Sequence, residues 1–585
     1  MFIAFFVFRN KMLTFKELKK QAKLDIEGDE YRVAVLGNVS TQLLSLGIKG
    51  SLKSQGINAA VFDADYNQID AQLLSETSET YSFNPDVIML YIATDKLYEE
   101  YLDEDIASRS SFAEMYLSKI TKYWDLINNY SKAKIIQANF TEIDDRAFGN
   151  YSTKEITSFI YQIRKLNFML NEAMSGRKDV YPLDILSLQI RMGLNSFYDS
   201  VLYYSSKMAV TLDAIELIAK NVTDIIKSFR GQFKKAVILD LDNTLWGGVI
   251  GDDGLGGIEI GELGSGHVYT DFQRWLKQLK NRGVLLCVCS KNNEDTAKEP
   301  FLNHEEMILR LDDFSIFVAN WEDKASNIKY IQKALNIGMD SFVFIDDNPF
   351  ERNLVREMIP EITVPELPVD PSMYLSFLQG ENLFETASFS EDDKDRTSMY
   401  QAEFKRKSLE LTYESIDDYL KNLEMTAEVK AFEPLRYSRI AQLTQRSNQF
   451  NLRTKRYTEA DIEQIANDNK YITLYFTLKD KFGDHGLVSV VIIEKTGDTE
   501  GFIDTWLMSC RVLKRGMEEF IVNSIVATAK EKGLLKLNAE YIATPKNKMV
   551  KDIYKTMGFI ETGDSKYELK LSDYIDNPTF ILKND

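Results

Sequence analysis

Acidic residues follow two of four short apolar runs in the middle third of this 585-residue sequence. Asp240 and Asp242 come after the first run, and Asp346 and Asp347 come after the last. Each run is typical of a buried strand, and the carboxyl ends of parallel strands meet at one edge of a sheet, so we expect these side chains to share a crevice. Clustered carboxylates need a hard cation beside an anionic substrate, and their oxygens suit Mg²⁺. The sequence thus predicts a magnesium site formed by all four aspartates, with Asp347 as a direct ligand and Asp346 behind it.

The segment DLDNTLWGG, from Asp240 to Gly248, resembles the first motif of the haloacid dehalogenase (HAD) superfamily. The resemblance implies that Asp240 attacks phosphorus and forms an aspartyl-phosphate, which divides one difficult substitution into two easier ones. It also implies that Asp242 protonates the leaving oxygen and later deprotonates the attacking water. Thr244 is expected to hold the tight turn that follows.

Polar residues after the other apolar runs match the remaining motifs of that superfamily. Ser290 and Lys324 would direct a hydroxyl and an ammonium at the oxygens that carry charge in the transition state. Lys291 and Asn292 are candidates for substrate binding. One acidic pair at a strand end is usually only solvent-exposed, but four polar endings in the right order favour an intact phosphoryl-transfer site. The chain between the motifs is too short for a separate cap domain, so we expect an open site.

Alternating apolar runs and helical stretches divide the chain into several domains. Before residue 231 the pattern predicts a parallel sheet with helices, and a second such sheet follows it. Four prolines between residues 360 and 371 mark the exit from the second sheet, and the last region reads as α+β. We expect an N-terminal segment at 1–30, an α/β domain at 31–230, a phosphoryl-transfer domain at 231–371, a helical linker at 372–425 and an α+β domain at 426–585.

Composition excludes some functions. The net charge of −19 argues against nucleic acid as a partner, because binding to phosphate backbones needs a broad basic surface. The apolar residues 1–8 are too few to span a membrane, and Met12 opens an amphipathic pattern at which translation is expected to start. Only three cysteines occur, and Cys287 and Cys289 are too close along one strand for an ordinary disulfide, so we expect a cytoplasmic protein.

Three downstream segments extend the resemblance beyond the phosphoryl-transfer motifs. Residues 439–457 (RIAQLTQRSNQFNLRTKRY), 482–490 (FGDHGLVSV) and 506–518 (WLMSCRVLKRGME), together with DLDNTLWGGVIGDDG, resemble the FkbH-like family over nearly the whole chain. The resemblance implies an SGNH-hydrolase-like N-terminal domain, a HAD-like domain with a Rossmannoid parallel sheet and a GNAT-like C-terminal domain. It further implies that a glyceryl unit from 1,3-bisphosphoglycerate is loaded onto the phosphopantetheine arm of an acyl carrier protein, and that the HAD site removes the remaining phosphate.

Cys510 is the candidate nucleophile of the C-terminal domain. Basic neighbours follow it closely, and positive charge stabilises a thiolate that attacks an acyl phosphate. The residues alone favour a buried strand cysteine instead, and the family resemblance brings the two interpretations level. His485 is a candidate to orient or deprotonate, or a packed histidine. Glu518 stands where the GNAT loop has glycine or alanine, which argues against binding a CoA pyrophosphate.

Residues 37–40 (GNVS) resemble the serine block of SGNH hydrolases, but all three histidines lie outside this domain. A hydrolase triad therefore has no imidazole base there, and we expect a degenerate hydrolase fold used for packing or partner contact. Residues 436–456 hold six basic residues and no acidic one, which predicts either a docking site for an acidic carrier or ordinary solvated charge.

Two other functions remain open at this point. The second interpretation is a stand-alone HAD phosphatase that acts on a small metabolite or a phosphoprotein, with the C-terminal domain used for binding. A third interpretation is a non-enzymatic assembly scaffold. The oligomeric state, the carrier protein and the exact three-carbon acid are not indicated by the sequence.

Overall fold

A computed structural model describes residues 12–387 and 415–584, together with positions 397, 399, 402, 406 and 413. The apolar residues 1–8 and much of the expected linker lie outside the described residues. The chain divides into two compact units, one reaching to Ile226 and one beginning at Lys227. None of the helices in the described part of the chain is long and apolar enough to cross a membrane.

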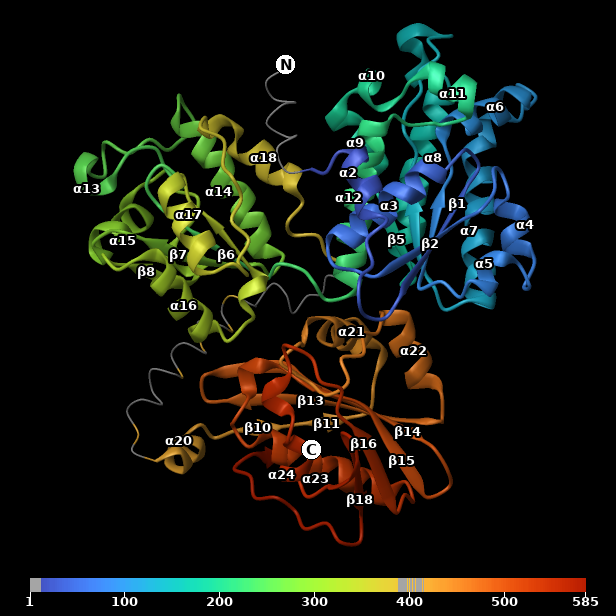
Figure 1. Ribbon diagram of the computed structural model, residues 1–585. Coiled ribbons are helices and arrows are strands. Elements are labelled where there is room, and N and C mark those ends of the chain that lie inside the picture. The colour runs from blue at the N-terminus through green and yellow to red at the C-terminus, as the bar shows by residue number, and fades with distance from the viewer. Residues whose placement is uncertain are drawn as a thin grey trace. The chain divides into compact units, whose positions relative to one another are not determined.

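The first unit contains a five-stranded parallel sheet in the order β2-β1-β3-β4-β5 (Figure 1). Side chains alternate between its two faces, as the period of a strand requires. Ala34 and Leu36 of β1 join the core formed with α7 and α8, and the other face is covered by α2, α3 and α12. The elements are α2 (Phe15–Gln21), β1 (Tyr31–Gly37), α3 (Gln42–Ser54), β2 (Ala59–Asp63), α4 (Ile69–Leu74), α5 (Glu79–Ser82), β3 (Val87–Tyr91), α6 (Thr94–Asp103), α7 (Phe112–Tyr130), β4 (Lys134–Ala138), α8 (Phe159–Ser175), β5 (Val180–Leu183), α9 (Ile185–Met192), α10 (Leu194–Phe197), α11 (Ser200–Ser206) and α12 (Leu212–Phe229).

The second unit begins with a four-stranded parallel sheet in the order β8-β7-β6-β9. All four strands are buried on both faces, which is why each reads as a continuous apolar run. One face packs against α14, α15 and α18, and the other against α16 and α17. The elements are β6 (Ala236–Leu239), α13 (Ile250–Asp253), α14 (Gly266–Asn281), β7 (Leu285–Ser290), α15 (Glu294–Asn303), β8 (Phe314–Ala319), α16 (Lys324–Leu335), β9 (Phe342–Ile345), α17 (Pro349–Met358) and α18 (Tyr374–Glu381).

The rest of the second unit is a mixed sheet with helices on both faces, the α+β class expected from the sequence. Its long strands β13, β14 and β15 are antiparallel, and β15 then pairs with β16 in parallel. Helices α21 and α22 cover one face, and α23 and α24 cover the other. The elements are α20 (Ile416–Asn422), β10 (Thr426–Ala427), β11 (Val429–Lys430), α21 (Tyr437–Arg446), β12 (Phe450–Asn451), α22 (Glu459–Asn467), β13 (Tyr471–Asp480), β14 (Gly483–Lys495), β15 (Glu500–Met508), α23 (Met517–Glu531), β16 (Lys536–Glu540), α24 (Ile553–Thr556), β17 (Ile560–Gly563), β18 (Lys566–Lys570) and β19 (Leu582–Lys583).

Gly50 lies where α3 passes close to the backbone of α2. A Cβ atom at this position would lie 2.1 Å from the carbonyl oxygen of Leu18, which cannot move without shifting α2. We expect Gly50→Ala to lower the free energy of unfolding of the first unit by about 1–3 kcal/mol through overpacking, despite alanine's better helix propensity. Denaturant unfolding would measure this. Gly176→Ala is the control, because the nearest atom would be 3.7 Å from its new Cβ. If both variants lose the same free energy of unfolding, the prediction is contradicted.

Candidate active site

Three carboxylates meet at the carboxyl ends of two neighbouring strands. Asp240 follows β6 and Asp346 follows β9, and the two strands are paired so that the Asp240 amide donates to the carbonyl of Ile345 at 3.0 Å. One oxygen from each of Asp240, Asp346 and Asp347 lies within 4.8 Å of the others. The structure therefore brings these three strand-end aspartates together, as the sequence predicted.

The ammonium of Lys324 lies against this group. Lys324 is the first residue of α16, and Asp323 caps that helix by accepting a hydrogen bond from the Ser326 amide. Its Nζ is 2.9 Å from Asp240 Oδ2 and 2.5 Å from Asp346 Oδ2, and its side chain is only 3% exposed. Burial alone would lower the pKa of Lys324, but attraction to the two carboxylates outweighs it and raises the pKa. The lysine is therefore held in its charged form.

The second oxygen of Asp240 has no such partner. Among the residues that the structure describes, none donates a hydrogen bond to Asp240 Oδ1, although this atom is buried. A buried carboxylate oxygen without a donor is costly, and three carboxylates exceed the charge of one ammonium. Oxygen ligands of this kind fit Mg²⁺, which Asp240, Asp346 and Asp347 would hold. Asp346 is fully buried and Asp347 is partly exposed, yet both belong to the group.

The carboxylate of Asp242 is not part of this three-carboxylate group, and the role of Asp242 as a fourth metal ligand stays a prediction. Its Oδ1 accepts hydrogen bonds from the Ile250 amide and from Trp246 Nε1, both at 3.0 Å, and its Oδ2 accepts one from Asn292 Nδ2 at 2.7 Å. These donors occupy both oxygens and turn them toward the following loop. Burial raises the pKa of Asp242 in spite of these donors. A carboxyl group that retains its proton more readily suits a general acid.

The turn after Asp242 is held by short-range polar contacts. Thr244 is buried, and its Oγ1 accepts a hydrogen bond from the Asp347 amide at 3.2 Å, which ties this turn to the acidic pair after β9. Asn243 adopts a left-handed φ of 53°, and its Oδ1 accepts a hydrogen bond from the Gly248 amide at 3.0 Å. The turn therefore holds the chain that follows Asp242 beside the acidic pair after β9.

The residues at and after the end of β7 make contacts within the site. Ser290 is the last residue of β7 and is buried. Asn292 donates a hydrogen bond to Asp242, and Lys291 forms a 2.5 Å ion pair with Glu351 Oε1. Their roles toward a substrate stay predictions. Sequence reasoning missed Glu351 and Trp246. Trp246 lies inside the DLDNTLWGG motif, and Glu351 follows the acidic pair by one helical turn, so both were close to recognised signals.

Cys510 occupies a turn and not a strand. β15 ends at Met508, and Cys510 begins a 3₁₀ turn, where it is partly exposed. Its carbonyl accepts a hydrogen bond from Asn336 Nδ2 at 3.0 Å, and Asn336 follows the last residue of α16. Lys324 begins that same helix at the aspartate cluster. The 12 residues of α16 span about 18 Å along the helix axis, at about 1.5 Å per residue, so the two sites lie near opposite ends of this helix.

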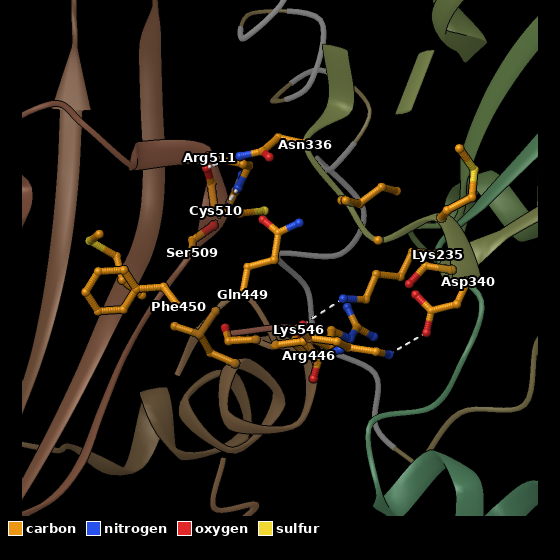
Figure 2. A pocket seen from close by; sticks show the side chains of 18 of the residues that line it. Lys235, Asn336, Asp340, Arg446, Gln449, Phe450, Ser509, Cys510, Arg511 and Lys546 are labelled. Carbon is orange, nitrogen blue, oxygen red and sulfur yellow. Dashed lines mark hydrogen bonds and ion pairs between the residues drawn. The ribbon is translucent and has the colours of Figure 1, made fainter. Parts of the chain in front are cut away.

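A cavity of about 470 Å³ opens beside Cys510 (Figure 2). Its described lining does not include His485, which was predicted to assist Cys510. His485 is buried, and its Nε2 lies 3.0 Å from Asp480 Oδ2, while Arg406 also binds Asp480. Burial lowers the pKa of His485 to about 4 despite this carboxylate, helped by repulsion from nearby arginines. Of the two interpretations left open for His485, these contacts favour the buried, packed histidine, and a role in assisting Cys510 stays a prediction.

Two further predictions concern anion binding and the serine block. Glu518 is buried near the start of α23, and its Oε1 accepts a hydrogen bond from the Lys514 amide at 3.0 Å; its effect on binding of a CoA pyrophosphate stays a prediction. In the serine block, Asn38 Oδ1 accepts a hydrogen bond from the Ala93 amide at 2.8 Å and links β1 to the end of β3. That asparagine has a structural contact.

Comparisons with known proteins agree with this arrangement. Residues 32–227 match the model of the FkbH N-terminal domain. The crystal structure of the N-terminal part of the protein BF1531 from Bacteroides fragilis, which contains a phosphatase domain and was solved in complex with Mg, is 44% identical, with a TM-score of 0.62, and the match covers 65% of this chain and 100% of that chain.

Other solved structures match a smaller part. The ribosomal-protein-S18-alanine N-acetyltransferase from Escherichia coli is 14% identical, with a TM-score of 0.20, over 26% of this chain and 99% of that chain. The GNAT domain of PAT from S. lividans is 13% identical, with a TM-score of 0.20, over 24% of this chain and 89% of that chain. A comparison with curated proteins gave no match.

Magnesium binding should be linked to pH through Asp346. Burial and repulsion from Asp240 raise the pKa of Asp346 to about 7, although Lys324 lowers it. Because the raised pKa leaves this carboxyl protonated at lower pH and Mg²⁺ needs the carboxylate, the Mg²⁺ affinity should rise as pH increases through about 7. Calorimetric titration in two buffers with different ionisation heats should detect release of a proton. Asp346→Asn should abolish that release; an affinity that does not change with pH would contradict the prediction.

Proposed function

The chain belongs to the FkbH-like family, and from this membership and the geometry of the aspartate cluster we propose that it loads a glyceryl unit onto an acyl carrier protein and then removes a phosphate. The donor in this proposal is 1,3-bisphosphoglycerate, and the acceptor is the phosphopantetheine thiol of the carrier. One observation carries the phosphatase part. Asp240 has one oxygen on Lys324 and one buried oxygen without a hydrogen-bond donor among the described residues, at the centre of a three-carboxylate group.

Phosphate removal follows from the positions of three side chains. Asp240 attacks phosphorus, so a bond from phosphorus to its carboxylate oxygen forms and the ester P–O bond breaks. Asp242 gives its proton to the departing oxygen and then takes one from the water that hydrolyses the aspartyl-phosphate. Lys324 holds the attacking carboxylate in place and offsets its charge. Mg²⁺ bound by Asp240, Asp346 and Asp347 would supply positive charge to the transferring phosphoryl group.

Acyl transfer is assigned to Cys510. Its sulfur attacks the acyl carbon of the donor, the C–S bond forms, and the bond from that carbon to the phosphate oxygen breaks, so inorganic phosphate leaves with the electron pair. The carrier thiol then takes the acyl group from Cys510 by thioester exchange. The position of Cys510 on an accessible turn beside a cavity supports this role.

The distance between the two sites supports transfer on a mobile arm. Cys510 and Lys324 lie at opposite ends of α16, about 18 Å apart by helix length. An acyl group bound to Cys510 cannot reach Asp240, whereas a thioester on a flexible arm of the carrier can be carried from one site to the other. Dephosphorylation is therefore expected after the acyl group has moved to the carrier.

A stand-alone phosphatase that acts on a small metabolite or a phosphoprotein is the second candidate. One observation favours it: His485, with a pKa lowered to about 4, is engaged with Asp480 and does not line the cavity beside Cys510. Under this alternative the aspartate cluster works in the same way, and Cys510 has no chemical role.

Asp240→Asn tests the phosphatase part. Loss of the attacking carboxylate should reduce hydrolysis of a generic phosphate ester by about 1000-fold or more, because an amide oxygen is a poor nucleophile. Steady-state release of inorganic phosphate would measure this. Asp252→Asn, which alters an exposed acid in α13, is the matched control and should keep full activity. Full activity in the Asp240 variant would support the scaffold interpretation and reject both phosphatase functions.

Cys510→Ser separates loading from phosphatase activity. With 1,3-bisphosphoglycerate and a carrier protein, the wild-type chain should add a glyceryl mass to the carrier, and Cys510→Ser should add none while still hydrolysing a generic phosphate ester. The Asp240→Asn variant should load a unit that retains one phosphate more. Intact-protein mass spectrometry of the carrier reads all three results. Loading by Cys510→Ser at the wild-type rate would reject the assignment of Cys510.

A further inference from the structure

The cavity beside Cys510 has two chemically different ends (Figure 2). Cys510, Ser509 and Gln449 lie at one end, where the side chain of Gln449 extends toward Cys510. Lys235, Arg446 and Lys546 gather with Asp340 at the other end. A ligand with a reactive carbon at one end and a charged group at the other would fit this division.

The charge of the lining favours an anion. Five cationic side chains line the cavity, against the carboxylates of Asp340 and Glu361, although the chain as a whole carries a net charge of −19. Asp340 is paired with Lys546, so part of the negative charge is already neutralised. A local cationic excess in an acidic protein raises the local concentration of anionic ligands. The cations are Lys235, Arg439, Arg446, Arg511 and Lys546.

The cationic end is held by contacts with the backbone and with an aromatic ring. Lys235 Nζ donates to the carbonyl of Arg446 at 2.7 Å, and the guanidinium of Arg446 lies 5.3 Å from the ring centroid of Phe233. Both charges therefore have fixed positions. Lys546 is more exposed and is paired with the side chain of Asp340, a carboxylate for which a phosphate can substitute.

The basic run at residues 436–456 contributes only part of itself to this cavity. Arg439 and Arg446 line it, whereas Arg453 and Lys455 bind the buried Asp504, and Arg456 donates to the carbonyls of Thr444 and Ser447. The run therefore does not form one continuous solvated face, and docking of an acidic carrier there stays a prediction. Arg439 and Arg446 belong to the lining of the cavity.

We propose that Lys235, Arg446 and Lys546 form a subsite for a phosphate monoester, which holds the phosphorylated end of the acyl donor while its acyl carbon lies at Cys510. This inference rests on the proposed function, since it takes the donor to be a three-carbon acid with an acyl phosphate at one end and a phosphate ester at the other. Only the acyl phosphate is lost when the C–S bond forms, so the ester phosphate remains bound at the cationic end.

Gln449 lies between the two ends and selects for a hydroxyl on the carbon next to the acyl group. Its Oε1 is buried, and no donor to it occurs within residues 12–387 and 415–584. A ligand hydroxyl can supply that donor. An acid that lacks this hydroxyl leaves the buried amide oxygen without a hydrogen bond. A polar site rejects such an acid more strongly than an apolar pocket rejects a ligand with an added hydroxyl.

Protection of Cys510 from alkylation tests the subsite in the full-length chain. Cys287 and Cys289 are fully buried in β7, so iodoacetamide labelling of the native protein reports on Cys510. 3-Phosphoglycerate carries the ester phosphate but cannot acylate a thiol, and it should slow the labelling. Lys546→Ala should raise the concentration needed for half protection by about tenfold, the effect of losing one charge-assisted hydrogen bond.

Two variants keep the test specific. Lys548→Ala, which changes an exposed lysine outside the lining, should leave protection unchanged. Asp340→Asn removes the carboxylate that competes for Lys546 and should preserve or strengthen protection. If the Lys546–Asp340 pair only supports the fold, Asp340→Asn will weaken protection as much as Lys546→Ala does, and the proposal is overturned.

The same preparations distinguish the remaining outcomes. If phosphopantetheine protects Cys510 better than 3-phosphoglycerate does, the cationic end is assigned to the carrier arm and the donor assignment is overturned. The donor assignment is also overturned if 3-phosphoglycerate gives no protection. Acylation of Cys510 by 1,3-bisphosphoglycerate, read by intact mass, tests the proposed function separately. If Cys510 is acylated but 3-phosphoglycerate gives no protection, the subsite is rejected and the proposed function stands. If 3-phosphoglycerate protects, Lys546→Ala abolishes that protection, and Cys510 is not acylated, the subsite is supported and the loading function is rejected.

Discussion

The contact of one buried ammonium with two buried carboxylates organises the catalytic end of the HAD-type sheet. Lys324 approaches Asp240 and Asp346 from the start of α16, and each carboxylate follows its own strand of the pair β6 and β9. Without this charge the carboxylates would repel one another in a site that water scarcely reaches. The ammonium meets only one oxygen of Asp240, and the other buried oxygen has no hydrogen-bond donor among the described residues, which leaves it for the proposed cation and phosphate. The helix, the two strands and the chemistry therefore depend on a single arrangement of charge.

Asp240 and Asp242 show how neighbouring carboxylates acquire different roles. Asp240 is surrounded by charges, with Lys324 on one side and the acidic pair after β9 on the other. Asp242 is surrounded by neutral donors from Trp246, Asn292 and the Ile250 amide, and burial raises its pKa. Neutral donors hold a carboxyl group in place without neutralising it, so it can still exchange a proton. The proposed roles of nucleophile and acid therefore follow from the neighbours of the two aspartates and not from the side chains themselves.

The sequence predicted the parts of this site that depend on local order along the chain. A buried strand followed by polar residues is visible in the printed residues, so Asp240, Asp346 and Lys324 were found with their partners. The direction of the Asp242 side chain could not be predicted in this way. It depends on the indole of Trp246 in the following loop and on the amide of Asn292 after another strand. Cys510 was placed in a strand because the apolar pattern continues through Met508, and only the turn after β15 exposes it. The sequence left the role of His485 open because the contacts that favour a packed histidine come from Asp480 and, through Asp480, from Arg406, which lie 5 and 79 positions away in the chain.

Helix α16 connects the two chemical sites and also keeps them apart. Its first residue supplies the ammonium at the aspartate cluster, and Asn336 just beyond its last residue donates to the carbonyl of Cys510. A rigid helix of 12 residues fixes a separation that neither thiol nor aspartate can close by rotating a side chain. An intermediate bound to Cys510 is thereby protected from the phosphatase until it leaves on a longer tether. In the proposed reaction this distance would set the order of the two steps, with acyl transfer to the carrier before dephosphorylation.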